Sequence, residues 1–162
     1  MTGNNKKILN IFLMGESTGH ISYAITELGI WDIVIVSSES TYEQNKGFLD
    51  QLEQTSIKIH EKITVDPFAA DSIMHISTRI VEAYQKYHLE GFEIRCGLTG
   101  GTNLMAIAMG VAALVTGAKC HYVGFKNNEN HLVNISSFTD IKKRIDFNDL
   151  NLLLRRGSTN VC

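Results

Sequence analysis

Hydrophobic runs of strand length alternate with stretches of helical spacing along most of the chain. Continuous or alternating apolar positions predict strands at residues 8–14, 31–36, 57–65, 92–98, 119–125 and 131–135. Apolar residues three or four positions apart predict helices at residues 21–28, 41–54, 69–88 and 102–115. Strands that are apolar throughout and separated by helices are typical of a parallel sheet covered on both faces. The predicted fold class is therefore α/β: a Rossmann-like, doubly wound, mainly parallel six-stranded sheet flanked by helices, whose short sixth strand can run antiparallel to the fifth.

Length and charge narrow the classes of protein that fit this pattern. The 162 residues suffice for one domain, expected at residues 1–138 and followed by a helical tail at 139–162. A net charge of −2 without a dense cluster of Lys and Arg argues against duplex nucleic acid as a partner. The N-terminus is polar, no apolar run approaches about 20 residues, and the three cysteines are widely separated, so a cytoplasmic protein is expected.

Three polar loops, at residues 15–20, 37–40 and 99–103, directly follow predicted strands. In doubly wound sheets the carboxyl ends of the strands form the ligand site, so these loops are expected to lie together there.

The third loop carries the clearest chemistry. Gly100 and Gly101 let the backbone turn sharply and approach a ligand without a Cβ in the way. Thr102 or Asn103 can cap the following helix, whose first N–H groups are unpaired and favour a phosphate. The hydroxyls of Thr99 and Thr102 are expected to add donors. This segment therefore predicts a loop that binds a phosphate-bearing nucleotide; the alternative is a glycine turn that only joins a strand to a helix.

The segment Leu98-Thr99-Gly100-Gly101-Thr102-Asn103-Leu104-Met105-Ala106 resembles the signature of CARF domains, the CRISPR-associated Rossmann-fold sensors of type III CRISPR systems. The first loop, Gly15-Glu16-Ser17-Thr18-Gly19, and the Asp66-Pro67-Phe68 turn resemble the family in position, so the resemblance covers residues 8–135. It implies a homodimer that binds a cyclic oligoadenylate, with cyclic tetra-adenylate the expected ring and cyclic hexa-adenylate the alternative, and thereby switches on an effector. It implies no cofactor and no metal, because members that cleave the ring use the ligand's own 2′-hydroxyl as the nucleophile.

The resemblance and the three loops together define a set of expected ligand-binding residues: Gly15, Glu16, Ser17, Thr18, Ser38, Glu39, Thr99, Gly100, Gly101, Thr102, Asn103, Met105 and Lys126. Ser17 and Asn103 are also the candidates for a catalytic role in ring cleavage. Many family members carry Lys where this chain has Asn103, and Asn supplies no positive charge, which argues against efficient cleavage. Lys126 is either a nearby cation or a solvated loop lysine.

Several alternatives remain open at this point. The protein is either a sensor that only binds the ring or a stand-alone ring nuclease, and a Rossmann-like domain for another nucleotide is a third interpretation. His20, beside the first loop, is either a general acid or base or part of a polar surface. The other histidines lack metal-binding spacing. The chain is either a free-standing sensor or part of a protein whose effector or membrane anchor lies outside it.

Overall fold

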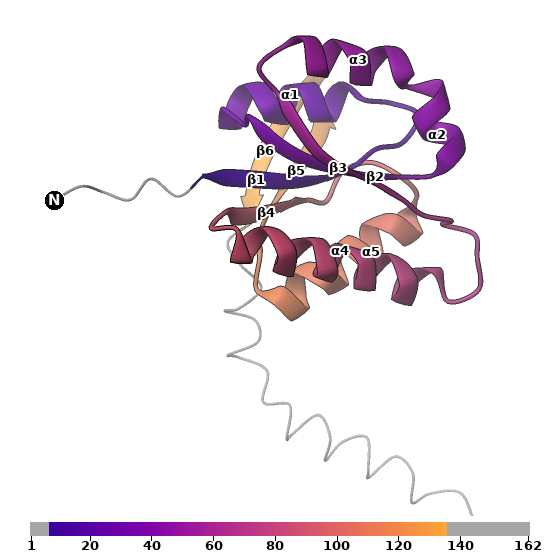
Figure 1. Cartoon of the computed structure of the whole chain (residues 1–162). Helices are drawn as coiled ribbons and strands as arrows, with labels where there is room; N and C mark the ends of the chain where they lie inside the picture. Colours follow the sequence, from indigo (N-terminus) through magenta and orange to yellow (C-terminus); the bar gives the residue numbers. More distant parts are fainter. Residues whose placement is uncertain (1–6, 136–162) are drawn as a thin grey trace, which may run out of the picture.

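The computed structural model describes residues 7–135, and its centre is a six-stranded sheet (Figure 1). In spatial order the strands are β3 (Lys58–Thr64), β2 (Asp32–Ser37), β1 (Ile8–Leu13), β4 (Glu93–Gly97), β5 (Lys119–Lys126) and β6 (Glu129–Ile135). The first five strands run parallel, and β6 pairs antiparallel with β5. The predicted doubly wound, mainly parallel six-stranded α/β sheet is therefore confirmed, including the direction of its last strand.

Helices cover both faces of the sheet (Figure 1). On one face lie α1 (Gly19–Leu28), α2 (Glu39–Gln44) and α3 (Lys46–Gln54); on the other lie α4 (Ser72–Leu89) and α5 (Asn103–Thr116). Successive residues of β1 point to opposite faces, so Leu9 and Ile11 pack with α4 and α5, whereas Phe12 packs with α1 and α3. Burial on both faces explains why β1 and β2 are almost continuously apolar. Within residues 7–135, no helix combines the length and the apolar character needed to cross a membrane.

Two predicted helices differ from the observed ones. The single helix expected at residues 41–54 is two helices, α2 and α3, which meet at Asn45. The side-chain amide of Asn45 donates to the carbonyl oxygens of Thr41 (3.1 Å) and Gly15 (3.2 Å), and the contact with Gly15 spans 30 positions of sequence. Local periodicity cannot report such a contact. The helix expected to begin at residue 69 begins at Ser72, and the tail predicted at 139–162 lies outside the described residues.

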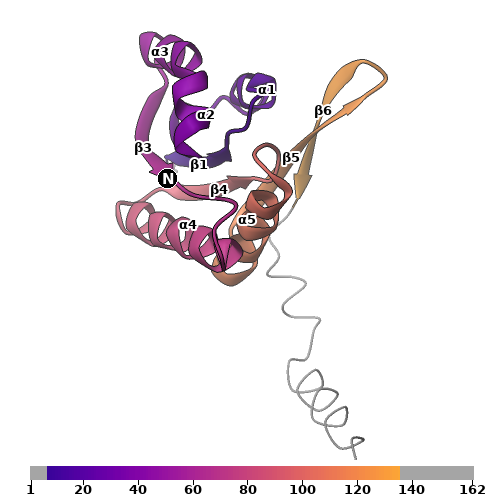
Figure 2. The same ribbon diagram turned by 90° about the vertical axis from the view of Figure 1, so that its right-hand side faces the viewer.

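The β5–β6 hairpin projects beyond the two helix layers (Figure 2). Its turn consists of Asn127 and Asn128, both at positive φ (53° and 64°), as in the two-residue turns that match the twist of paired strands. This turn is shorter than the polar stretch predicts, and β6 accordingly begins at Glu129 instead of residue 131. The hairpin therefore carries strand pairing out past the body of the sheet, as far as the Lys126–Glu129 pair.

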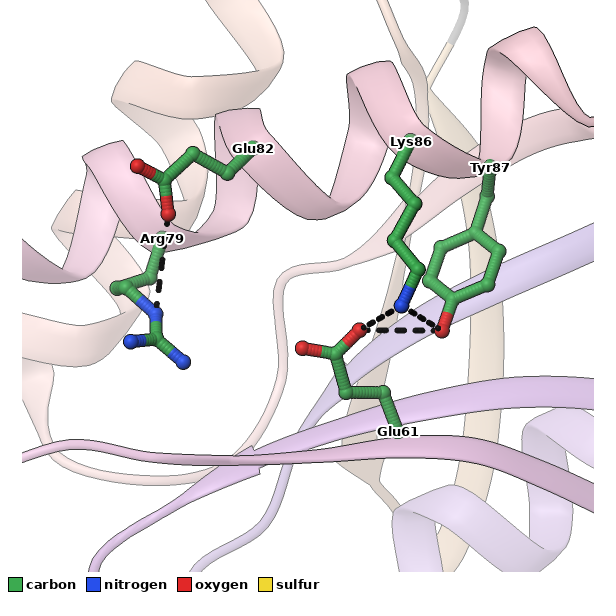
Figure 3. A network of polar contacts seen from close by, with 5 residues as sticks. All are labelled: Glu61, Arg79, Glu82, Lys86 and Tyr87. Atoms are coloured by element: carbon green, nitrogen blue, oxygen red, sulfur yellow. Dashed lines mark hydrogen bonds and ion pairs between the residues drawn. The ribbon is translucent and has the colours of Figure 1, made fainter.

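Polar contacts hold α4 against the edge strand β3. Glu61 of β3 accepts hydrogen bonds from Lys86 Nζ (2.9 Å) and from the hydroxyl of Tyr87 (3.1 Å), as Figure 3 shows. Arg79 and Glu82 form a separate, exposed pair at 3.9 Å on the same helix. Exposed ion pairs stabilise a protein by only about 0–1 kcal/mol. These contacts therefore orient α4, while the buried apolar residues beneath it supply most of its stabilisation.

Candidate functional site

The chain changes its winding direction between β1 and β4, the two central strands. The segment after β1 leads to α1 on one face of the sheet, and the segment after β4 leads to α5 on the other (Figure 1). Loops that diverge in this way open a crevice at the carboxyl ends of the strands, where ligands of doubly wound proteins bind. Gly15 and Gly101 approach each other here so closely that a Cβ on Gly15 would lie 2.9 Å from the backbone nitrogen of Gly101.

Gly100 is enclosed by the end of β1 and by the start of α1. The Nε2 atom of His20 donates a hydrogen bond to the carbonyl oxygen of Leu13 at 2.9 Å, and a Cβ on Gly100 would overlap both groups. Gly100 also has a φ of +103°, which side chains rarely allow. Burial lowers the pKa of His20 although its hydrogen bond to Leu13 opposes this, so the ring is neutral near pH 7. With Nε2 as the donor, Nδ1 of His20 is an acceptor.

The start of α5 supplies donors beside this glycine contact. Of the two predicted candidates for the cap, Thr102 and Asn103, Thr102 is the N-cap, and its hydroxyl oxygen accepts a hydrogen bond from the backbone N–H of Met105 at 3.3 Å. The N–H groups of Asn103 and Leu104 have no acceptor within the helix, because the first turn of any helix lacks them. Together with the positive end of the helix dipole they make this position favourable for a phosphate.

Two cavities lie on either side of the Gly15–Gly101 contact, and Gly15, Glu16 and Gly101 line both of them. The first, called here the hairpin cavity, has a volume of about 470 Å³ and is bounded by Ser17, His20, Gly100, Phe125 and Asn130. The second, the turn cavity, has a volume of about 450 Å³ and is bounded by Ser38, Thr41, Phe68, Thr102 and Met105. Both volumes fall within the range of about 300–1,000 Å³ that is usual for small-molecule sites.

The structure brings most of the residues predicted for the site to these cavities. Those that line one or both are Gly15, Glu16, Ser17, Ser38, Thr99, Gly100, Gly101, Thr102 and Met105. Four others, Thr18, Glu39, Asn103 and Lys126, are not among the lining residues. Thr18 is the N-cap of α1, and Asn103 is the exposed first residue of α5. Lys126 lies at the end of β5, paired with Glu129 in the hairpin.

The hydroxyl of Thr99 is engaged within the protein, which differs from the free donor that the loop predicts. It accepts a hydrogen bond from the backbone N–H of Val123 at 2.7 Å and donates to the carbonyl oxygen of the same residue at 3.1 Å. This pair of bonds ties the loop after β4 to β5. The Thr102 hydroxyl differs, because it uses only its oxygen to cap the helix and keeps its hydrogen available to a ligand.

Several residues at the site were not among those predicted for ligand binding, and three of them bear on its chemistry: Asn45, Phe68 and Phe125. Asn45 supports the first loop through its bond to the carbonyl oxygen of Gly15. Phe125 lines the hairpin cavity, and Phe68 lines the turn cavity. The turn that contains Phe68 belongs to the resemblance described above, but nothing local identified the phenylalanine itself as part of the site. Phe125 extends the alternating pattern of a strand and is therefore indistinguishable in sequence from a buried residue.

The charges around the cavities are unusual for an anion site. Among the described residues, no Lys or Arg lines either cavity, and the acidic residue Glu16 lines both. An anion at this edge therefore depends on backbone N–H groups, and Glu16 suits the amino or hydroxyl groups of a nucleoside. Across residues 7–135, no three His, Cys, Asp or Glu side chains are grouped so that they could hold a metal ion.

This geometry defines a class of protein: a Rossmann-like α/β domain with a paired cavity at its switch point. No protein-family model matches the chain, and no curated protein matches it. Solved structures do match. Can2 from Sulfobacillus thermosulfidooxidans, in complex with cyclic tetra-adenylate, is 14% identical with a TM-score of 0.59, over 80% of this chain and 38% of Can2. Protein VC1899 from Vibrio cholerae is 9% identical with a TM-score of 0.61, over 80% of this chain and 36% of that protein.

Csm6 from Enterococcus italicus, bound to cyclic hexa-2′-fluoro-hexa-dAMP, is 12% identical with a TM-score of 0.60, over 78% of this chain and 36% of Csm6. A type III CRISPR defence DNA nuclease activated by cyclic oligoadenylate matches 82% of this chain with 21% of its own length. The chain thus spans between about a fifth and two fifths of the proteins it matches. It has the fold of CARF-domain proteins, which confirms the expected fold.

Proposed function

We propose that the chain is a CARF-type sensor module that binds a cyclic oligoadenylate, specifically cyclic tetra-adenylate, between the two copies of a homodimer in type III CRISPR antiviral signalling. The observation that carries the proposal is the pair of cavities that meet at the Gly15–Gly101 contact beside the start of α5. Two spaces that are each large enough for a nucleoside, next to a helix end that favours a phosphate, suit a ligand with several nucleosides. The buried free cysteines Cys96 and Cys120 fit a reducing compartment, so we place the sensor in the cytoplasm.

Calorimetric titration with cyclic tetra-adenylate tests this function. We expect saturable binding of one ring per two chains, with weaker binding of cyclic hexa-adenylate. Linear tetra-adenylate is the matched control ligand, because it has the same bases but is not pre-organised as a ring, and it is expected to bind more weakly. Titrations without binding of either ring would contradict the proposed function.

Binding without cleavage is the preferred form of this function. Cleavage needs groups that orient the 2′-hydroxyl and stabilise the charge that develops on the phosphate. Ser17 lines the hairpin cavity, but no cationic side chain accompanies it among the described residues, and Asn103 is neutral. After prolonged incubation with the protein, cyclic tetra-adenylate should be recovered intact by chromatography. Accumulation of linear products would favour the ring-nuclease alternative instead.

An exposed apolar stripe supports the homodimer. Ile107, Val111 and Val115 follow one another along the exposed side of α5, with Val111 exposed to 40% and Val115 to 60%. Met74 of α4, 68% exposed, lies beside Val111 around a shared apolar depression. Contiguous exposed apolar surface of this kind is typical of an interaction site. A second copy of the chain would cover it and bring a second pair of cavities into one assembly.

The variant Val111→Asp is expected to weaken the dimer by about 2 kcal/mol or more, because it places an unpaired carboxylate within a buried apolar interface. Sedimentation velocity should show a monomer at concentrations where the wild type is dimeric. Leu89→Asp is the matched control. Leu89 is 87% exposed and is the last residue of α4, whereas Met74 lies near the first, so Leu89 is outside the stripe. A wild-type monomer, or a Val111→Asp dimer of unchanged stability, would contradict the proposed interface.

A further inference from the structure

We propose that Phe68 and Phe125 are stacking platforms for two nucleobases, one in the turn cavity and one in the hairpin cavity. This rests on the proposed function, because it states how each protomer holds two consecutive nucleosides of the ring. Phe68 is 82% exposed and Phe125 is 72% exposed. Single exposed apolar residues are common on proteins. Here, however, each of the two cavities has one such phenylalanine in its wall, on opposite sides of the glycine contact.

The backbone holds Phe68 in place at the rim of the turn cavity. The N–H of Phe68 donates to the Asp66 carboxylate at 2.9 Å, which closes a local turn around Pro67. Pro67 restricts its own φ and lines the cavity together with Phe68. The ring is thus presented by a restrained turn but has little protein packed against it. A base that enters the turn cavity would cover this ring.

The β5–β6 hairpin holds the backbone of Phe125 in place at the hairpin cavity. Val123, two residues earlier on β5, packs into the core beneath α1, and alternate residues of a strand share a face. Phe125 therefore lies on the α1 side of the hairpin, beyond the end of that core. Its backbone pairs with Asn130, which also lines the hairpin cavity. The short turn at Asn127 and Asn128 fixes this pairing, so the aromatic ring is presented by paired strands and not by a free loop.

The connection between the two cavities matches the linkage between two nucleosides. A ligand with one base in each cavity has to pass over the Gly15–Gly101 contact, where neither residue has a side chain. This path runs beside Thr102 and the first N–H groups of α5, which suit the intervening phosphate. Glu16 lines both cavities and is placed to accept hydrogen bonds from an adenine amino group or a ribose hydroxyl. Two nucleosides per protomer make four in a dimer, as in cyclic tetra-adenylate.

The test separates stacking from simple apolar contact. Phe68→Leu and Phe125→Leu keep an apolar side chain but remove the aromatic face, and each is expected to weaken binding of cyclic tetra-adenylate roughly 5- to 100-fold by calorimetry. Phe68→Trp and Phe125→Trp retain the aromatic face and should bind within about threefold of the wild type, since stacking on Trp is comparable. Trp31→Phe is the matched control, because Trp31 is an exposed aromatic at the amino end of β2, away from both cavities.

Tryptophan fluorescence provides a second measurement. Quenching of the emission on addition of ligand requires a folded binding site, so an unfolded variant would not show it. Trp31 is the only tryptophan of the chain, so a Trp31→Phe background allows each introduced indole to be observed alone. Saturation with cyclic tetra-adenylate should quench the emission of both Phe68→Trp and Phe125→Trp in that background, because adenine stacks on each indole. Leu variants that bind within about twofold of the wild type, or indoles without a response, would overturn the stacking proposal while the proposed function stands. An effect at only one position would overturn the two-base arrangement, and a wild type that binds neither ring would overturn both proposals.

Discussion

Gly100→Ala is expected to lower the free energy of unfolding by about 3 kcal/mol and to abolish ring binding. Two effects add at this position. The backbone has a φ of +103°, where a residue with a Cβ is strained by about 1–3 kcal/mol. The new methyl group would also overlap His20 Nε2 and the carbonyl oxygen of Leu13, and crowding of this kind costs about 1–3 kcal/mol. Since that carbonyl belongs to the central strand, the loop has to move, and the glycine contact between the cavities moves with it.

Urea unfolding and ring titration of the same variant measure the two parts of this prediction. Gly47→Ala is the matched control, because Gly47 lies in the first turn of α3 and an added methyl group there would meet no atom within 4 Å. Its replacement should be neutral or stabilising by up to about 1 kcal/mol, since Ala favours helices more than Gly does. A Gly100→Ala protein as stable as the wild type would show that the loop adapts easily, and the close packing around His20 would then have no role in the site.

The second large effect concerns acid pH and the buried His121. Its side chain lies on the sheet beneath α1, with its ring edge against Phe12 at 5.5 Å between centroids. Burial, with smaller contributions from Arg95 and His20, lowers the pKa of His121 to about 4. Below its ordinary pKa of 6.5 the unfolded chain therefore takes up a proton that the folded protein does not accept until about pH 4. The free energy of unfolding is fully retained above about pH 6.5 and should fall by about 3 kcal/mol between about pH 6.5 and pH 4.

His121→Leu removes this proton uptake and should flatten the acid part of the stability profile. Urea unfolding at several pH values between about 7.5 and 4.5 gives the slope, which is informative even if the variant is less stable throughout. His20, whose pKa burial also lowers, contributes in the same direction and should account for part of the remaining slope. His75→Gln on the exposed side of α4 removes a histidine without this environment and serves as the control. A wild-type profile that is flat down to about pH 4.5 would contradict the prediction.

The fold was largely predictable because its signals are local. β1 and β2 are apolar runs of strand length, and the glycine after each of α1 and α5 marks where that helix ends, as Gly29 and Gly117 do with left-handed backbones. The length of the β5–β6 turn was misjudged locally, whereas the break in the helix predicted at residues 41–54 depends on a contact distant in sequence. Asn45 divides a predicted helix in two because its amide reaches Gly15, and a residue pattern cannot report a partner 30 positions away.

Part of the candidate site was likewise predictable from local sequence, and part of it depends on tertiary packing. Residues close in the chain were enough to predict the glycine loop, the Thr102 cap and the edge of the sheet where the loops meet, because backbone conformation and helix capping are local properties. Three features came from the three-dimensional packing instead: the contact of Gly15 with Gly101, the bonds of the Thr99 hydroxyl to Val123, and the exposure of Phe68 and Phe125 at two cavities. Exposure and hydrogen bonding depend on which segments lie side by side. The sequence therefore shows that Phe125 belongs to a strand with alternating apolar positions. The packing around the strand determines whether the aromatic ring is buried or exposed to a ligand.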